Sequence, residues 1–295
     1  MSENITPQRP TRPRRFRRQP LSDGTQMAFT GVELVVVLAV LVVLVGLRLV
    51  ASSDSKALSA RVICLNNLRQ LTTAWTCYAH DFGGFLPGNL GNGEVGIVSY
   101  SNMTWCLGYM DFTGGNPAGA DTDTSLLKMG QIGRYIGDVR IFKCPADFSL
   151  SHGTSGLPRV RSVAMNCYVG QRAGPYTVGF MQFQKMNDLL VSSPSRTYVF
   201  LDEREDSIHE DAFELDMTGS DPVDPGVLQM VSIPADYHDR GANLSFADGH
   251  AETWRWRDPR TTPPRIAGQL PTLGQRMPSN VDIQRLQAVA SRRAN

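Results

Sequence analysis

The sequence predicts an α+β fold, in which a long N-terminal helix crosses a membrane with its first half and packs its second half on an antiparallel β-sheet with long irregular loops. Three observations predict this fold. Residues 29–50 form an apolar segment. No proline occurs between Pro20 and Pro87, and beyond the apolar segment small or apolar residues recur every three or four positions. From Asp81 onward, Gly, Pro, Asn and Asp interrupt short apolar runs, as is typical of strands and loops.

These patterns divide the 295 residues into five parts. They are a basic leader (1–28), the membrane-spanning half of the helix (29–50), its amphipathic half (51–80), a globular domain (81–257), and a proline-rich tail with a short final helix (258–295). Basic and acidic residues nearly balance, with 29 Lys and Arg against 28 Asp and Glu. This balance argues against a nucleic-acid partner.

The apolar segment has the length of a membrane span, which needs about 20 mostly apolar residues. Six arginines precede residue 20, and basic residues beside a span stay in the cytoplasm. We therefore expect a single-pass protein of the cytoplasmic (inner) membrane that contacts the lipid bilayer, with its N-terminus cytoplasmic and its C-terminal domain outside. A secretory signal peptide and a Val-rich core strand are the alternatives, although a small-x-small cleavage site is poorly formed after the segment.

The helix is expected to run from Thr30 to about Ala79, with one apolar face at Ala57, Ala60, Cys64, Leu68, Leu71, Trp75 and Tyr78. Predicted strands follow at 97–100, 160–165, 197–201, 243–246 and 251–256. The dipeptide Asp248 and Gly249 predicts a hairpin turn between the last two strands. Ser279 is the expected cap of a final helix in which Val281, Leu286 and Val289 face the domain.

The residues at the start of the apolar segment resemble the cleavage and methylation segment of type IV pilins and type II secretion pseudopilins. The matching residues run from Ala28 and Phe29 to Glu33 and Leu34. The resemblance implies that a prepilin peptidase cuts between Ala28 and Phe29 and methylates Phe29. It also implies that Glu33, the fifth mature residue, pairs with the amino terminus of a neighbouring subunit. Ala28 replaces the usual Gly, and Gly31 replaces a large apolar residue.

Later segments resemble pseudopilin-like proteins with a processing-associated H-X9-DG domain. His238 and the dipeptide Asp248 and Gly249 carry the name-giving pattern. The other matching segments are CLNNLRQL (64–71), FKCPAD (142–147), RSVAMNCYVG (161–170) and PSRTYVFLDE (194–203). The cysteines in the first two segments suggest a disulfide between Cys64 and Cys144.

The five cysteines show no C-x-x-C spacing, which argues against a zinc site or a redox dithiol. One or two disulfides and a role as small buried residues both remain open. His238, Asp202 and Asp248 are the candidate metal ligands, with Glu203 and His250 nearby in the sequence. Ca²⁺ is the candidate cofactor because it prefers oxygen ligands in loops. The competing interpretation is that His238 bonds backbone near the hairpin.

Enzymatic motifs are absent from the sequence, including a nucleophile elbow, a P-loop and an H-E-x-x-H helix. Ser245, His238 and Asp248 can be named as a trio, but such residues often occur together by chance. Trp254 and Trp256 share one face of a predicted strand. Sugar binding and packing in the core are the two interpretations of this pair, and core packing is the favoured one.

We therefore expect a pilin-like structural subunit without enzymatic activity, either a pseudopilin or a minor pilin. Its partners would be the prepilin peptidase and other pilin-like subunits of a type II secretion or type IV pilus-like system. The alternative is a membrane-tethered module that binds glycan or metal and does not polymerise.

Overall fold

The computed structural model describes residues 30–91, 93–170, 178–266 and 268–294, and the side chains of 46–54 lie outside this description. The predicted leader, 1–28, is likewise outside the described residues. The chain forms two compact units, Met1–Ala51 and Ser52–Asn295. Each is described by itself.

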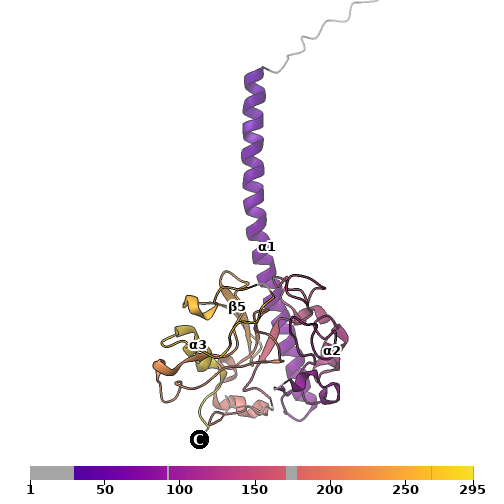
Figure 1. Cartoon of the computed structure of the whole chain (residues 1–295), viewed down its shortest axis with the longest axis vertical. Coiled ribbons are helices and arrows are strands. Elements are labelled where there is room, and N and C mark those ends of the chain that lie inside the picture. The colour runs from indigo at the N-terminus through magenta and orange to yellow at the C-terminus, as the bar shows by residue number, and fades with distance from the viewer. Residues whose placement is uncertain (1–29, 92, 171–177, 267, 295) are drawn as a thin grey trace, which may run out of the picture. The chain divides into compact units, whose positions relative to one another are not determined.

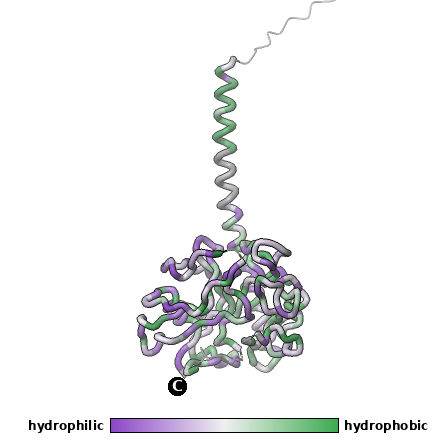
Figure 2. The backbone as a smooth tube through the Cα atoms, viewed as in Figure 1, coloured by the Kyte–Doolittle hydropathy of each residue, from purple (hydrophilic) through white to green (hydrophobic). Residues whose placement is uncertain are grey.

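Helix α1 covers Gly31–Asp81 and passes through both units. Its start is fixed by a capping box between Thr30 and Glu33. The Glu33 carboxylate accepts hydrogen bonds from the backbone nitrogen and the hydroxyl of Thr30, both at 2.8 Å, and the Glu33 nitrogen donates to that hydroxyl at 3.3 Å. Figure 2 shows the hydrophobic character of the first turns of α1.

The predicted membrane span is corrected by the structure. Among the described helices, none is both long and apolar enough to cross a membrane. The predictions of a transmembrane helix over 29–50 and of a single-pass location in the cytoplasmic membrane are therefore wrong.

The second unit is built on a five-stranded sheet with the order β3-β1-β2-β5-β6. The strands are β1 (Val163–Asn166), β2 (Tyr198–Asp202), β3 (Ala212–Phe213), β5 (Gly241–Phe246) and β6 (Ala251–Arg255). All neighbours are antiparallel except β1 and β3, which are parallel. The sheet is therefore mixed, and the predicted purely antiparallel sheet is wrong, because β3 pairs with the free edge of β1 in the same direction. Strands β4 (Gln229–Met230) and β7 (Gln275–Arg276) form a separate pair.

The hairpin of β5 and β6 is the best-predicted part of the sheet. Gly249 has φ of 93°, which only glycine adopts without strain, and its nitrogen donates to the Phe246 carbonyl at 2.9 Å. The strand predicted at 97–100 is wrong. That segment forms 3-10 turns, in which the nitrogens of Ile97 and Tyr100 bond to carbonyls three residues earlier, both at 2.9 Å.

Helices cover both faces of the sheet (Figure 1). The second half of α1 buries Leu68, Leu71 and Trp75 completely against one face. The opposite face packs in a second core with α3 (Val281–Ala290), while α2 (Thr124–Met129) lies in the loop region that follows α1. Asn280, rather than the predicted Ser279, caps α3, and Val281 is 41% exposed.

Candidate functional site

His238 is held in a tight turn directly before β5. Asp239 and Arg240 both have left-handed backbones, with φ of 55° and 59°. The His238 nitrogen donates to the Gly241 carbonyl at 3.1 Å, which closes the turn. Two consecutive non-glycine residues in this region are costly and persist only where their surroundings enforce them. The turn directs the His238 side chain into the protein, where it is 1% exposed.

Cys144 lies in a second turn, two residues after the end of the 3-10 helix η4 (Val139–Phe142). Its nitrogen donates to the Ser162 hydroxyl at 2.8 Å, and its carbonyl accepts from the Asp147 nitrogen at 3.0 Å. The Ala146 nitrogen lies 3.4 Å from the Cys144 sulfur and donates to it. These bonds fix the sulfur in the interior, and Cys144 is fully buried.

Cys64 and Asp202 complete the cluster from α1 and from the end of β2. The Cys64 thiol lies 3.0 Å from each Asp202 carboxylate oxygen. The Asn243 nitrogen donates to the same carboxylate at 3.2 Å. Asp202 has no exposed surface and Cys64 only 1%. A carboxylate this deeply buried needs compensation by partners such as these.

The four side chains meet around one point. His238 Nε2 lies 3.3 Å from the Cys144 sulfur and 3.4 Å from Asp202 Oδ2. One sulfur, nitrogen or oxygen atom from each of Cys64, Cys144, Asp202 and His238 lies within 4.8 Å of the others. We call these four residues the buried cluster.

Burial and proximity shift the pKa values in the buried cluster. Burial raises the pKa of Cys64 well above its ordinary value, and its neighbours Cys144 and Asp202 add to this effect. Burial also acts against ionisation of Cys144, but hydrogen bonds with Cys64 and His238 outweigh it and lower the Cys144 pKa. Burial opposes a charge on His238 as well, yet its bonds to Asp202 and Cys144 raise its pKa to about 9. Cys144 is therefore the more acidic thiol.

No family model, no curated protein and no solved structure matches this chain.

The structure brings together two of the three predicted metal ligands, Asp202 and His238. The third, Asp248, lies apart from them. His238 precedes β5, whereas Asp248 follows it, and six strand residues span about 20 Å. Asp248 is exposed and pairs with His250 at 2.5 Å. Ser245 accepts a bond from Thr72 at 2.8 Å, so the trio of Ser245, His238 and Asp248 does not assemble.

The predicted disulfide partners also meet in the buried cluster. Their sulfurs lie within 4.8 Å of each other. Neither Cys64 nor Cys144 forms a disulfide in the described structure. The disulfide between Cys64 and Cys144 therefore stays a prediction.

The tryptophans and Glu203 have local structural partners. Trp256 is buried and donates to the Ala235 carbonyl at 2.7 Å. Trp254 packs under the Arg285 guanidinium, 4.3 Å from its ring centroid. These contacts of Trp254 and Trp256 favour core packing over sugar binding.

Glu203 is also held by a local contact. Burial raises the pKa of Glu203 to about 8, although the Ser207 hydroxyl donates a hydrogen bond to its carboxylate.

The predicted processing site, Ala28 and Phe29, lies outside the described residues. Glu33 is described and is solvent-exposed in the capping box. Its hydrogen bonds from the backbone and hydroxyl of Thr30 lower its pKa. A local partner for Glu33 is therefore present within its own helix.

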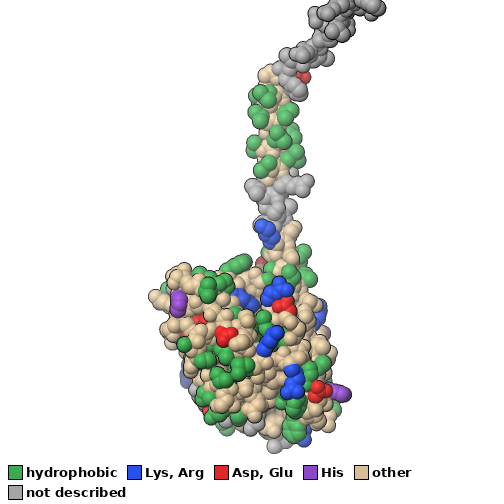
Figure 3. All heavy atoms as spheres, turned by 90° about the vertical axis from the view of Figure 1, so that its right-hand side faces the viewer, with side chains coloured by type: hydrophobic (Ala, Val, Ile, Leu, Met, Phe, Trp, Pro, Cys, Tyr) green, Lys and Arg blue, Asp and Glu red, His purple; other side chains and the backbone are tan. Residues whose placement is uncertain are grey.

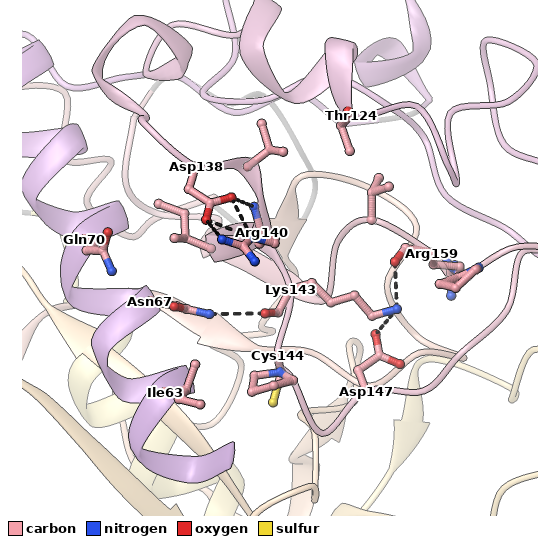
Figure 4. Close-up of a pocket in the computed structure, with 15 residues that line it drawn as sticks. Ile63, Asn67, Gln70, Thr124, Asp138, Arg140, Lys143, Cys144, Asp147 and Arg159 are labelled. Atoms are coloured by element: carbon pink, nitrogen blue, oxygen red, sulfur yellow. Dashed lines mark hydrogen bonds and ion pairs between the residues drawn. The ribbon is translucent and has the colours of Figure 1, made fainter. Parts of the chain in front are cut away.

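The buried cluster borders two pockets. A pocket of about 710 Å³ is lined by Cys144 and, on α1, by Ile63, Asn67 and Gln70 (Figure 4). Lys143 crosses it and donates to the Arg159 carbonyl at 2.7 Å. A smaller pocket of about 180 Å³ is lined by His238 and by Ala57, Leu58 and Arg61 of α1, with Tyr237 and Asp239. Each pocket is therefore lined by one member of the buried cluster.

The sequence points to all four residues but not to one common site. It suggests a disulfide between Cys64 and Cys144, and a calcium site that combines Asp202 and His238 with Asp248. The signal that links them is weak: each lies within one of the short segments that carry the family resemblance.

Proposed function

We propose that this chain is a pilin-like structural subunit, a pseudopilin or minor pilin of a type II secretion or type IV pilus-like system, and not an enzyme. The apolar surface of α1 carries the proposal. The large apolar side chains in residues 32–45 are 46% to 75% exposed (Figure 3). Consecutive apolar residues place apolar side chains on all sides of a helix. Such a surface is stable only when other apolar groups pack against it.

We propose that copies of the same helix from other subunits pack against this apolar surface and bury it. The resemblance of residues 28–34 to the pilin processing segment supports this choice, because in that family the helices pack together in a filament core. Apolar packing between long helices needs no directional partner and can repeat from copy to copy. Processing by a prepilin peptidase would make Phe29 the first residue of the mature chain.

Glu33 allows two explanations that an experiment can separate. In the first, its charge pairs with the amino terminus of a neighbouring copy. In the second, it serves only its own helix through the capping box with Thr30. Glutamine can replace glutamate in a capping box but carries no charge.

The test compares Glu33→Gln and Glu33→Ala in the full chain, expressed in cells that contain a prepilin peptidase. We expect both variants to lose assembly, measured as crosslinked multimers, by at least about tenfold, which corresponds to about 1.4 kcal/mol. Mass spectrometry of the wild-type amino terminus should find a methylated Phe29. Glu94→Gln, a change at an exposed acid in the globular unit, is the control and should assemble normally.

If the Glu33→Gln variant assembles at the wild-type level, the charge of Glu33 is not needed for assembly and its role is limited to capping its own helix. An intact leader on the wild-type protein, together with wild-type chains that yield only monomers, would overturn the proposed function.

A further inference from the structure

We propose that the buried cluster binds one zinc ion, held by the sulfurs of Cys64 and Cys144, Asp202 Oδ2 and His238 Nε2. The site is independent of the pilin-like function proposed above. It rests on four donor groups of the right chemical types that meet in the interior from four distant parts of the chain.

The distances suit a tetrahedral zinc site. Zinc binds sulfur at about 2.3 Å and nitrogen or oxygen at about 2.0–2.2 Å, so neighbouring ligand atoms of a tetrahedron lie about 3.3–3.8 Å apart. In the structure, the ligand atoms lie 3.0 Å apart for Cys64 and Asp202, 3.3 Å for Cys144 and His238, and 3.4 Å for His238 and Asp202. No pair exceeds 4.8 Å. Small side-chain movements therefore reach the required geometry.

The donor set identifies zinc among the common metals. Two thiolates and an imidazole are soft or intermediate ligands, which select zinc over calcium or magnesium. Calcium takes six to eight oxygens, and the buried cluster offers a single carboxylate. Four protein ligands also leave no open coordination position, which is typical of a structural zinc site and not of a catalytic one.

Neighbouring groups hold the ligands in place, as metal sites require. The Asn243 nitrogen donates to Asp202 Oδ2, and the Ala146 nitrogen donates to the Cys144 sulfur. His238 Nδ1 is buried and has no hydrogen-bond partner among the described residues. With Nε2 on zinc, Nδ1 carries the proton, and His238 lines the adjoining pocket of about 180 Å³.

The proposed ion would join α1 to the sheet. Cys64 belongs to α1, Asp202 ends β2, His238 precedes β5, and Cys144 follows η4. No disulfide joins Cys64 to Cys144 in the described structure. A zinc ion would therefore act as a crosslink between four segments that the chain itself connects only through long loops.

The experiment measures metal in the full chain purified from cells under reducing conditions. We expect about one zinc per chain by elemental mass spectrometry, and tetrahedral cobalt spectra with thiolate bands after exchange with Co²⁺. Cys144→Ser and Asp202→Asn should each weaken zinc binding by at least about tenfold, because even changes at the partners of metal ligands cost about 10- to 100-fold. Calcium should not compete.

The matched control is Cys77→Ser, which changes an exposed cysteine on the same helix and should keep the metal. Circular dichroism identifies which variants are folded, and Asp202→Asn preserves the side-chain shape in case Cys144→Ser unfolds. Reduced, folded wild-type protein that takes up no zinc would overturn the proposal. So would a Cys64–Cys144 disulfide in the protein as isolated, or full zinc binding by folded Asp202→Asn and Cys144→Ser.

Discussion

At the scale of single residues, Arg161 shows how a buried charge can organise loops. Its side chain is 1% exposed and donates to the carbonyls of Val163, Glu210 and Gly108 at 3.2, 2.7 and 3.0 Å. These carbonyls belong to three different segments of the second unit. Bonds from a charged donor are stronger than bonds from a neutral one, so one side chain joins the three segments.

We predict that Arg161→Met lowers the free energy of unfolding by about 3–5 kcal/mol, because it leaves three buried carbonyls without their donor. Urea denaturation of the full chain measures the change. Arg140→Met is the control, because the Arg140 side chain is 88% exposed and its solvent-screened ion pair with Asp138 should contribute little to stability. Equal effects of the two substitutions would contradict the role given to Arg161.

At the scale of elements, the second half of α1 is a packing surface whose position the sequence period predicts. Of the predicted apolar face, Cys64, Leu68, Leu71, Trp75 and Tyr78 are buried, whereas Ala57 is exposed. The strand opposite α1 presents small polar groups, as in the bond from Thr72 to Ser245. The helix is thus held by its apolar stripe and by a polar contact with β5.

Leu71→Ala should destabilise the second unit by about 2–5 kcal/mol, since it opens a cavity at a fully buried position between α1 and the sheet. Thr73→Ala, two residues away on the exposed side of α1, should change stability by less than about 0.5 kcal/mol. Thermal and urea unfolding of both variants provide the comparison. A Leu71→Ala loss under 1 kcal/mol would mean that this part of α1 does not anchor the sheet.

At the scale of the whole molecule, the proposed zinc ion links metal supply to stability. Ligand that binds only the folded state stabilises it by about 4 kcal/mol at a concentration 1,000-fold above its dissociation constant. For a unit of 295 − 52 + 1 = 244 residues, each 1 kcal/mol shifts the melting temperature by about 2–4 °C.

Removal of zinc by a strong chelator should therefore lower the melting temperature of the full chain by about 8–16 °C. Differential scanning calorimetry measures the shift, and added zinc should reverse it while added calcium should not. The Asp202→Asn variant is the control, because its weaker zinc binding should make the shift on adding chelator smaller than in the wild type. If the melting temperature of the wild-type protein does not change when the chelator is added, the proposal of a stabilising ion is contradicted.

The sequence by itself determined the features that depend on neighbouring residues. The turn at Asp248 and Gly249, the helical period through Leu68, Leu71 and Trp75, and the breaks by Gly and Pro are local, because each is decided within a few residues. The segment predicted as a strand at 97–100 failed for the opposite reason. A strand needs a partner from elsewhere in the chain, and this segment satisfied its own backbone in 3-10 turns.

Only the tertiary structure decided the candidate metal site. Cys64 and Asp202 are 138 positions apart, and Cys144 and His238 are 94 apart, yet their side chains meet within 4.8 Å. Sequence spacing predicts a metal site only when the ligands lie close along the chain, as in C-x-x-C. Asp248 is predicted as a ligand with His238 because carboxylates in loops suit Ca²⁺, but a six-residue strand separates the two residues. The position of each ligand depends on how the helix and strands pack, which no local pattern records.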